Sequence, residues 1–288
     1  MSGGGSGGGS GGGSGGGSGG GSSGGYGGPF PPHPFPINKP LLNTIQPGDL
    51  LTGLTYPWTG WRGDLFGFVA VAEFCRTDWR CIKVSPPPTG ADVFTEINQL
   101  IAMAQDERGD CAEEILQQDD SGFGAFFVQL LGMTTASHPN TLKLLEMAAR
   151  VGEVVSIWFK LVYNRPRPQQ VYPPLMPMLP PPGHASYPSG HATQSHLIAL
   201  ALADAVDYAQ RPAPIIRKAL MALADRIAHN REVAGVHYPS DSACGKSIAD
   251  QVYPFLRGCE VFQTVLALAR AEPATPGAVA PAPECSAN

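Results

Sequence analysis

Apolar residues recur at helical spacing along most of this chain, and that periodicity constrains the fold more than any other feature. Residues 91–107 show it most clearly, because their apolar positions fall on one stripe of an amphipathic helix. The predicted stripe consists of Val93, Phe94, Ile97, Leu100, Ile101 and Ala104. Alternating β-branched stretches, which are typical of strands, are almost absent. The sequence therefore predicts an all-α fold, a bundle of long helices.

Proline and glycine divide the remaining apolar segments into separate helices. The stretch "GFGAFFVQLLGM" is apolar all round, which predicts a short buried helix. A long helix is expected to begin at the Ser-His-Pro of residues 137–139 and to end near Tyr163, where "RPRP" stops it. Further helices are expected at about 189–207, 214–230, 240–252 and 256–270.

Composition divides the chain into three parts. Residues 1–28 are nearly pure Gly and Ser, so we expect a flexible linker or low-complexity tail there. Residues 29–270 are expected to form a single all-α domain, which starts with a Pro-rich irregular arm over 29–60. Residues 271–288 are rich in Ala and Pro and are expected to form a disordered tail.

Charge, hydropathy and cysteine pattern narrow the class of protein. The net charge of −5 argues against a nucleic-acid partner. No apolar run approaches the ~18 residues of a membrane span. No signal peptide is visible, but the Gly/Ser segment can have replaced the native N-terminus, so the sequence leaves localisation open. It also leaves the oligomeric state open. The six cysteines are too scattered for a zinc site; free thiols are expected, with a Cys75–Cys81 disulfide as the alternative.

Three polar clusters interrupt the helical pattern, and together they predict a site for an oxyanion. Lys160, Arg167 and Arg231 supply cations, and the planar arginine fork matches the oxygens of phosphate. Ser189 supplies a hydroxyl and an N–H, and Gly190 lets its own N–H approach the anion. Both lie where a helix begins, so the helix dipole favours an anion there. Taken singly, each cluster is an ordinary solvated helix end or capping turn.

Two histidines complete this candidate site. His191 and His237 can flank the central atom of the anion, as in-line displacement at phosphorus requires of a nucleophile and a proton donor. Asp241 follows His237 by four residues, and Pro239 between them predicts a turn before the next helix. From there the carboxylate can accept the distal imidazole N–H and fix the tautomer.

The ordered pattern Lys-x6-Arg-Pro, Pro-Ser-Gly-His and Arg-x5-His-x3-Asp resembles the type 2 phosphatidic acid phosphatase and vanadium haloperoxidase superfamily, as a soluble bacterial-type member. The resemblance covers about residues 140–255. The matching positions are Lys160, Arg167, Pro168, Pro188, Ser189, Gly190, His191, Arg231, His237 and Asp241. One position departs from the family pattern, because Asn230 stands where the family usually has Ser.

The resemblance implies an all-α bundle with the active site at helix ends, and it leaves two chemistries open. In the phosphatases, the residue matching His237 attacks phosphorus and forms a phosphohistidine, the residue matching His191 protonates the leaving group, and no cofactor is needed. In the haloperoxidases, the same pocket holds vanadate, with the residue matching His237 as axial vanadium ligand. The substrates are then a small-molecule phosphate ester, or a halide plus hydrogen peroxide.

Two sequence features bear on the choice between phosphatase and haloperoxidase, and they favour different answers. The motifs are closely spaced, with 19 residues between Pro168 and Pro188 and 39 between His191 and Arg231. This compactness resembles the soluble bacterial acid phosphatases. In contrast, His184 lies seven residues before His191, as a second histidine does in bromoperoxidases. His184 can equally be interpreted as a solvent-facing residue of the Pro-rich loop. We favour the phosphatase and keep the haloperoxidase as the alternative.

Overall fold

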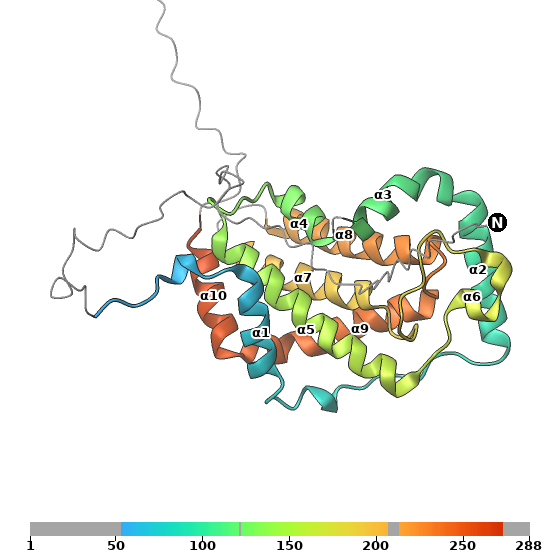
Figure 1. The fold of residues 1–288 in the computed structure, drawn as a ribbon, viewed down its shortest axis with the longest axis horizontal. Helices are drawn as coiled ribbons and strands as arrows, with labels where there is room; N and C mark the ends of the chain where they lie inside the picture. The colour runs from blue at the N-terminus through green and yellow to red at the C-terminus, as the bar shows by residue number, and fades with distance from the viewer. Residues whose placement is uncertain (1–52, 121, 207–212, 273–288) are drawn as a thin grey trace, which may run out of the picture.

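The computed structural model describes residues 53–120, 122–206 and 213–272, and within these ranges it is all-helical (Figure 1). The predicted all-α fold is confirmed. The α-helices are α1 (Gly63–Phe74), α2 (Ala91–Asp106), α3 (Arg108–Asp120), α4 (Gly124–Leu131), α5 (Pro139–Tyr163), α6 (Pro168–Val171), α7 (Gly190–Val206), α8 (Ala213–Val233), α9 (Pro239–Gly258) and α10 (Glu260–Arg270). Short 3-10 turns lie at Trp58–Gly60, Trp79–Cys81 and Pro173–Leu175.

Helix α7 occupies the centre of the bundle, and α5, α8 and α9 pack around it (Figure 1). Its sequence "LIALALADAV" is apolar apart from Asp204 near the end, which is typical of a helix without a solvent-facing stripe. Helix α5 begins at Pro139, as the Ser-His-Pro signal predicts. It ends at Asn164, whose left-handed φ of 45° suits asparagine as a C-terminal cap.

Two glycines allow the close packing that sets the position of α7. A Cβ on Gly152 of α5 would lie 3.0 Å from the Cα of Gln194. A Cβ on Gly245 of α9 would lie 2.8 Å from the carbonyl oxygen of Ser189. Because no side chain occupies either position, α5 and α9 approach the first turns of α7 from two sides. The start of α7 is therefore held where the predicted site residues meet.

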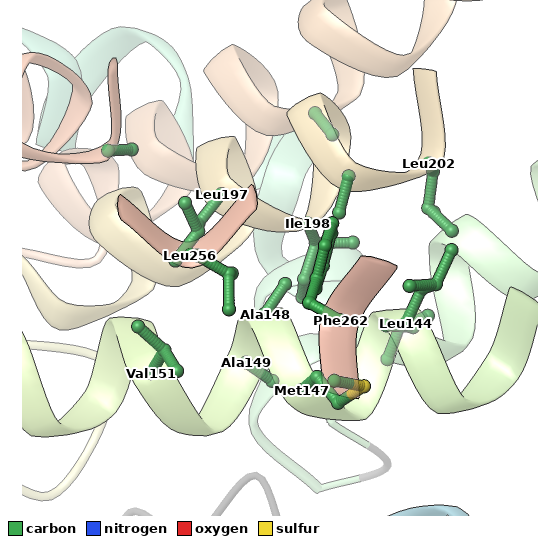
Figure 2. Packing of buried hydrophobic residues seen from close by; sticks show 14 of the residues in the cluster. Leu144, Met147, Ala148, Ala149, Val151, Leu197, Ile198, Leu202, Leu256 and Phe262 are labelled. Atoms are coloured by element: carbon green, nitrogen blue, oxygen red, sulfur yellow. The ribbon is translucent and has the colours of Figure 1, made fainter. Parts of the chain in front are cut away.

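The hydrophobic core lies between these same helices (Figure 2). Side chains from α5, α7, α9 and α10 interdigitate in it, among them Leu144, Met147, Val151, Leu197, Ile198, Leu202, Leu256 and Phe262. Burial of a large apolar side chain contributes about 1.5–3 kcal/mol, so this cluster supplies the main favourable term of folding. The polar site residues lie outside it, at the ends of the helices.

Several expectations about single elements need correction. Phe94 is 73% exposed, although the helical stripe places it inside; Ile97 and Leu100 of that stripe are buried. Helix α9 continues past the expected end at residue 252, through Pro254, to Gly258. Helices α1 and α3 are not expected from the sequence, because α1 is too uniformly apolar to show a period and α3 too polar.

Other expectations concern the termini, the cysteines and membrane spans. The predictions for residues 1–28, for most of the 29–60 arm and for nearly all of 271–288 concern segments outside the described residues. Five cysteines are described and all are free, so the Cys75–Cys81 disulfide does not form. In the part of the chain that the structure describes, no helix combines the length and the apolar character needed to cross a membrane.

Candidate oxyanion-binding active site

The Pro-Ser-Gly-His turn leads into the first turn of α7. The buried Ser189 caps this helix, because its hydroxyl oxygen accepts the N–H of Ala192 at 3.3 Å. Its own N–H donates to the carbonyl oxygen of Asp241 at 2.9 Å. That N–H is therefore already used, and of the two groups expected from Ser189 only the hydroxyl stays a candidate donor to an anion. A Cβ on Gly190 would lie 3.9 Å from the Lys160 side chain, on the side of the cations.

Two of the predicted cations are almost fully buried and are held by carbonyl oxygens. The Lys160 ammonium donates to the carbonyl oxygens of Ala185 and Ser186 at 2.9 and 2.8 Å. The Arg167 guanidinium donates to the carbonyl oxygen of Val236 at 2.7 Å and to that of His184 at 3.0 Å. Carbonyl oxygens orient a cation but do not neutralise it. Burial therefore lowers the pKa of Lys160 well below its usual range and that of Arg167 to about 10.

The third cation, Arg231, has hydrogen-bond partners on one side of its guanidinium and none on the other. Its Nη2 donates to the carbonyl oxygen of Ile115 at 3.1 Å and to the side-chain oxygen of Gln118 at 2.9 Å. Its Nε and Nη1 are buried, and no group in the described part of the chain hydrogen-bonds to them; the nearest carboxylate, of Asp119, lies 3.9 Å from Nη1. A buried donor without an acceptor is costly, so this edge of Arg231 suits an incoming anion.

His237 and Asp241 form the pair that their spacing predicts. The Nδ1–H of His237 donates to Oδ2 of the fully buried Asp241 at 2.9 Å. The Nε2 atom therefore carries the lone pair. Burial lowers the pKa of His237 well below its usual range, and the cations of Lys160 and Arg167 lower it further. The imidazole is neutral at physiological pH, as a nucleophile must be.

His191 lies on the first turn of α7 under the influence of the same charges. Burial lowers the pKa of His191 well below its usual range, and Arg231, His237 and Lys160 contribute in that order. Hydrogen bonds from Lys160 to Ser186 and from Arg167 to Val236 link the three sequence clusters around this turn. The His191 ring also contacts Phe123, with 4.9 Å between ring centroids. A bound dianion would offset the cations and favour the protonated imidazole, which is then a proton donor.

His184 is exposed, but it does not simply face solvent. Its Nδ1 lies 3.1 Å from Nη2 of Arg167. The residue as a whole is exposed, but partial desolvation of its ring, followed by the charge of Lys160, lowers the pKa of His184 to about 4. Asn230, which stands where the family usually has Ser, donates to the side-chain oxygens of Glu114 and Gln118 at 3.1 and 3.2 Å. Asn230 therefore supports α3 beside Arg231.

Sequence reasoning missed two side chains that bind the Asp241 carboxylate. Nη1 of Arg165 donates to Oδ1 at 2.6 Å, and the hydroxyl of Ser186 donates to Oδ2. Arg165 is the first arginine of "RPRP", two residues before Arg167, so the presence of two arginines in that motif was the available signal. Ser186 lies in "HASYPSGH" and carries no pattern of its own. The described ranges contain no group of three or more His, Cys, Asp or Glu side chains arranged for a metal ion.

Part of the chain matches a known protein family. Residues 141–249 match the family model of the PAP2 superfamily. This match confirms the resemblance that the three motifs predict, and the segment contains every site residue expected from the sequence. Gln118, which holds Arg231, lies before the matched segment.

The curated relatives are phosphatases. Two proteins described as decaprenylphosphoryl-5-phosphoribose phosphatase, from Mycobacterium tuberculosis strains CDC 1551 / Oshkosh and ATCC 25618 / H37Rv, are 32% identical over 104 residues. The aligned stretch covers 36% of this chain and 52% of each relative, so the chain spans about half the length of the curated relatives it matches. Among solved structures, the first transmembrane PAP2-type phosphatidylglycerolphosphate phosphatase from Bacillus subtilis is 15% identical. That similarity covers 68% of this chain and 83% of the other, with a TM-score of 0.34.

Proposed function

With the PAP2 superfamily match as premise, we propose that this chain hydrolyses phosphate monoesters through a phosphohistidine on His237. The observation that carries the proposal is the unpaired, buried edge of Arg231 beside two further buried cations and a neutral histidine held by Asp241. That combination binds a multiply charged oxyanion and places a nucleophile against it. The relatives, which are described as phosphatases, support the same reaction class.

The chain's own residues account for both half-reactions. In the first, Nε2 of His237 attacks phosphorus, the ester P–O bond breaks, and His191 transfers a proton to the departing alkoxide oxygen. In the second, His191 takes a proton from water, whose oxygen attacks the phosphohistidine; the P–N bond breaks and inorganic phosphate leaves. Asp241 keeps the proton on Nδ1 throughout and stabilises the positive charge that develops on the ring.

The cations act on the transition state. Charge on the equatorial oxygens of the phosphoryl group is stabilised by preorganised donors in a site that excludes water. Arg231 presents Nε and Nη1, and Lys160 and Arg167 are already oriented by carbonyl oxygens. None of them has to reorganise when the anion arrives, which is the basis of this form of catalysis. No cofactor enters the proposed reaction.

The same donor set fits vanadate, a tetrahedral oxyanion like phosphate that readily becomes five-coordinate. Nε2 of His237 would bind the vanadium, and Lys160, Arg167 and Arg231 would hold the oxygens. Bound vanadate would supply peroxide activation for halide oxidation. The contact of His184 with Arg167 places a second histidine beside this set, so haloperoxidase chemistry stays the alternative.

The test compares both activities on one preparation. We expect hydrolysis of p-nitrophenyl phosphate, inhibition by vanadate in competition with phosphate, and no turnover by His237→Ala. His191→Ala should lose more activity on alkyl phosphates than on p-nitrophenyl phosphate, because a good leaving group needs little protonation. Equal losses on both substrates would contradict the general-acid role. The protein can instead brominate a phenol dye when vanadate and peroxide are added, and release no phosphate when vanadate is absent. That result would favour the haloperoxidase.

A further inference from the structure

Glu96 of α2 is a buried carboxylate outside the segment that matches the PAP2 superfamily. Its side chain is 9% exposed, and its two oxygens have different partners. Oε2 accepts from Nη2 of Arg165 at 2.6 Å, and Oε1 accepts the N–H of Ser240 at 2.8 Å. Ser240 lies in the first turn of α9, one residue before Asp241. Glu96 therefore binds the segment that carries the Asp241 carboxylate from a distant part of the chain.

Arg165 bridges Glu96 and Asp241. Its Nη1 donates to Oδ1 of Asp241 at 2.6 Å while its Nη2 donates to Glu96. The flat guanidinium lies over the Tyr238 ring, with its carbon 3.6 Å from the ring centroid. These contacts fix the plane of the guanidinium. The result is one continuous buried chain of hydrogen bonds, from Glu96 through Arg165 and Asp241 to the Nδ1–H of His237.

The balance of charges around Arg165 explains how the Glu96 carboxylate can affect His237. A buried Asp241 paired with Arg165 alone would form a neutral couple, and its pull on the His237 N–H would be weakened. Glu96 gives Arg165 a second counter-charge, so the three groups together carry one net negative charge. Electrostatic interactions are strong in a buried site, so this charge acts on the His237 ring.

We propose that Glu96 is a positioning residue of the reaction, which acts through Arg165 to keep Asp241 an effective acceptor for His237. The proposal rests on the proposed function, since His237 is the nucleophile there. It also assigns a part in the site to α2, which lies before the matched segment. Groups that orient histidines by hydrogen bonds from outside a metal site change affinity or activity by about 10- to 100-fold, and we expect an effect of that order here.

The experiment separates chemistry from folding by using single turnovers with enzyme in excess of p-nitrophenyl phosphate. At enzyme concentrations high enough to saturate this rate, the rate constant of p-nitrophenolate release reports attack by His237 and does not depend on the fraction of folded enzyme. Glu96→Gln should lower this rate constant about tenfold or more and leave the Kd for inorganic phosphate within about threefold. The matched control is Glu153→Gln on α5, which removes a surface carboxylate paired with Arg150 and should leave the rate constant unchanged.

A double-mutant cycle tests whether the effect passes through Arg165. Arg165→Lys keeps the charge, but a single ammonium does not have the planar fork that spans both carboxylates. If Glu96 acts through Arg165, then Glu96→Gln added to Arg165→Lys should lower the rate constant no further. Multiplicative losses would overturn the proposal, because independent residues are additive in free energy.

A second measurement needs no turnover. The proton on Nδ1 of His237, observed by NMR and assigned with His237→Gln, reports the strength of its hydrogen bond to Asp241. We expect Glu96→Gln to shift it upfield. A wild-type protein without phosphatase activity would reject the proposed function but leave this readout intact. An unshifted proton, or a Glu96→Gln rate constant within twofold of wild type, would reject the role of Glu96 alone.

Discussion

The N–H of Ser189 donates to the main-chain carbonyl oxygen of Asp241 at 2.9 Å, so one residue supports both histidine segments. The Asp241 side chain orients His237, and its main chain fixes the turn that leads into His191. Movement of either segment would disturb the other. The proposed nucleophile and the proposed acid are therefore held relative to each other by backbone contacts as well as by side chains.

Asp241→Asn should reduce both catalysis and stability. The amide does not hold the His237 tautomer, so we expect kcat to fall by about 10³- to 10⁴-fold. It also removes a fully buried charge from Arg165, which should lower the free energy of unfolding by roughly 3 kcal/mol. Asp64→Asn is the control, because Asp64 forms an exposed ion pair with Arg62 at the start of α1. Chemical denaturation and steady-state kinetics measure both effects; an unchanged kcat in Asp241→Asn would contradict the assigned role.

Gly245→Ala should separate α9 from the start of α7. The new methyl would lie 2.8 Å from the Ser189 carbonyl oxygen and 2.9 Å from the Ala192 side chain, both parts of a rigid helix start. Overpacking of this kind lowers stability by about 1–3 kcal/mol, and we expect loss of activity with it. Gly258→Ala on the same helix meets nothing within 4 Å and should be neutral or slightly stabilising. Thermal unfolding of the two variants gives the comparison, and equal melting temperatures would refute it.

Arg231→Gln should abolish most anion binding. Phosphate at 100 times its Kd should stabilise the wild-type protein by about 2.7 kcal/mol, because only the folded state binds it. The variant lacks the unpaired Nε and Nη1 donors, so the same phosphate concentration should stabilise it far less. Arg226→Gln, an exposed arginine on the same helix, is the control. Retention of the full stabilisation by Arg231→Gln would place the anion elsewhere.

Stability should fall between about pH 6.5 and pH 9 through His229. The carboxylates of Glu232 and Glu107 raise the pKa of His229 to about 9, with Glu107 at 2.6 Å from Nε2. A raised pKa in the folded state means that the stabilisation is complete below the unfolded pKa of about 6.5 and is lost as the pH rises through 9. The stability difference between wild type and His229→Gln should therefore shrink across this window. A difference that grows with pH would show the opposite linkage.

Most of the long helices, and the cations and histidines of the proposed site, follow from local sequence. Helix α5 begins and ends where Pro139 and the "RPRP" motif require, because proline acts on its immediate neighbours in the chain. The three motifs name the cations and the histidines, since a phosphoryl site needs those side chains. Phe94 shows the limit of such reasoning, because helical periodicity does not reveal which part of a stripe another helix covers.

The sequence by itself determined the all-α class, the main helices and which residue types form the proposed oxyanion site, because each of these depends on neighbours within a few positions. Only the tertiary structure decided how the charges are balanced. Arg165 binds Asp241 rather than joining Arg167 beside the anion, the Ser189 N–H is used by a carbonyl oxygen, and Glu96 reaches the site from α2. These outcomes depend on the packing of α2, α7 and α9, since a buried polar group must take its partner from whatever segment lies next to it.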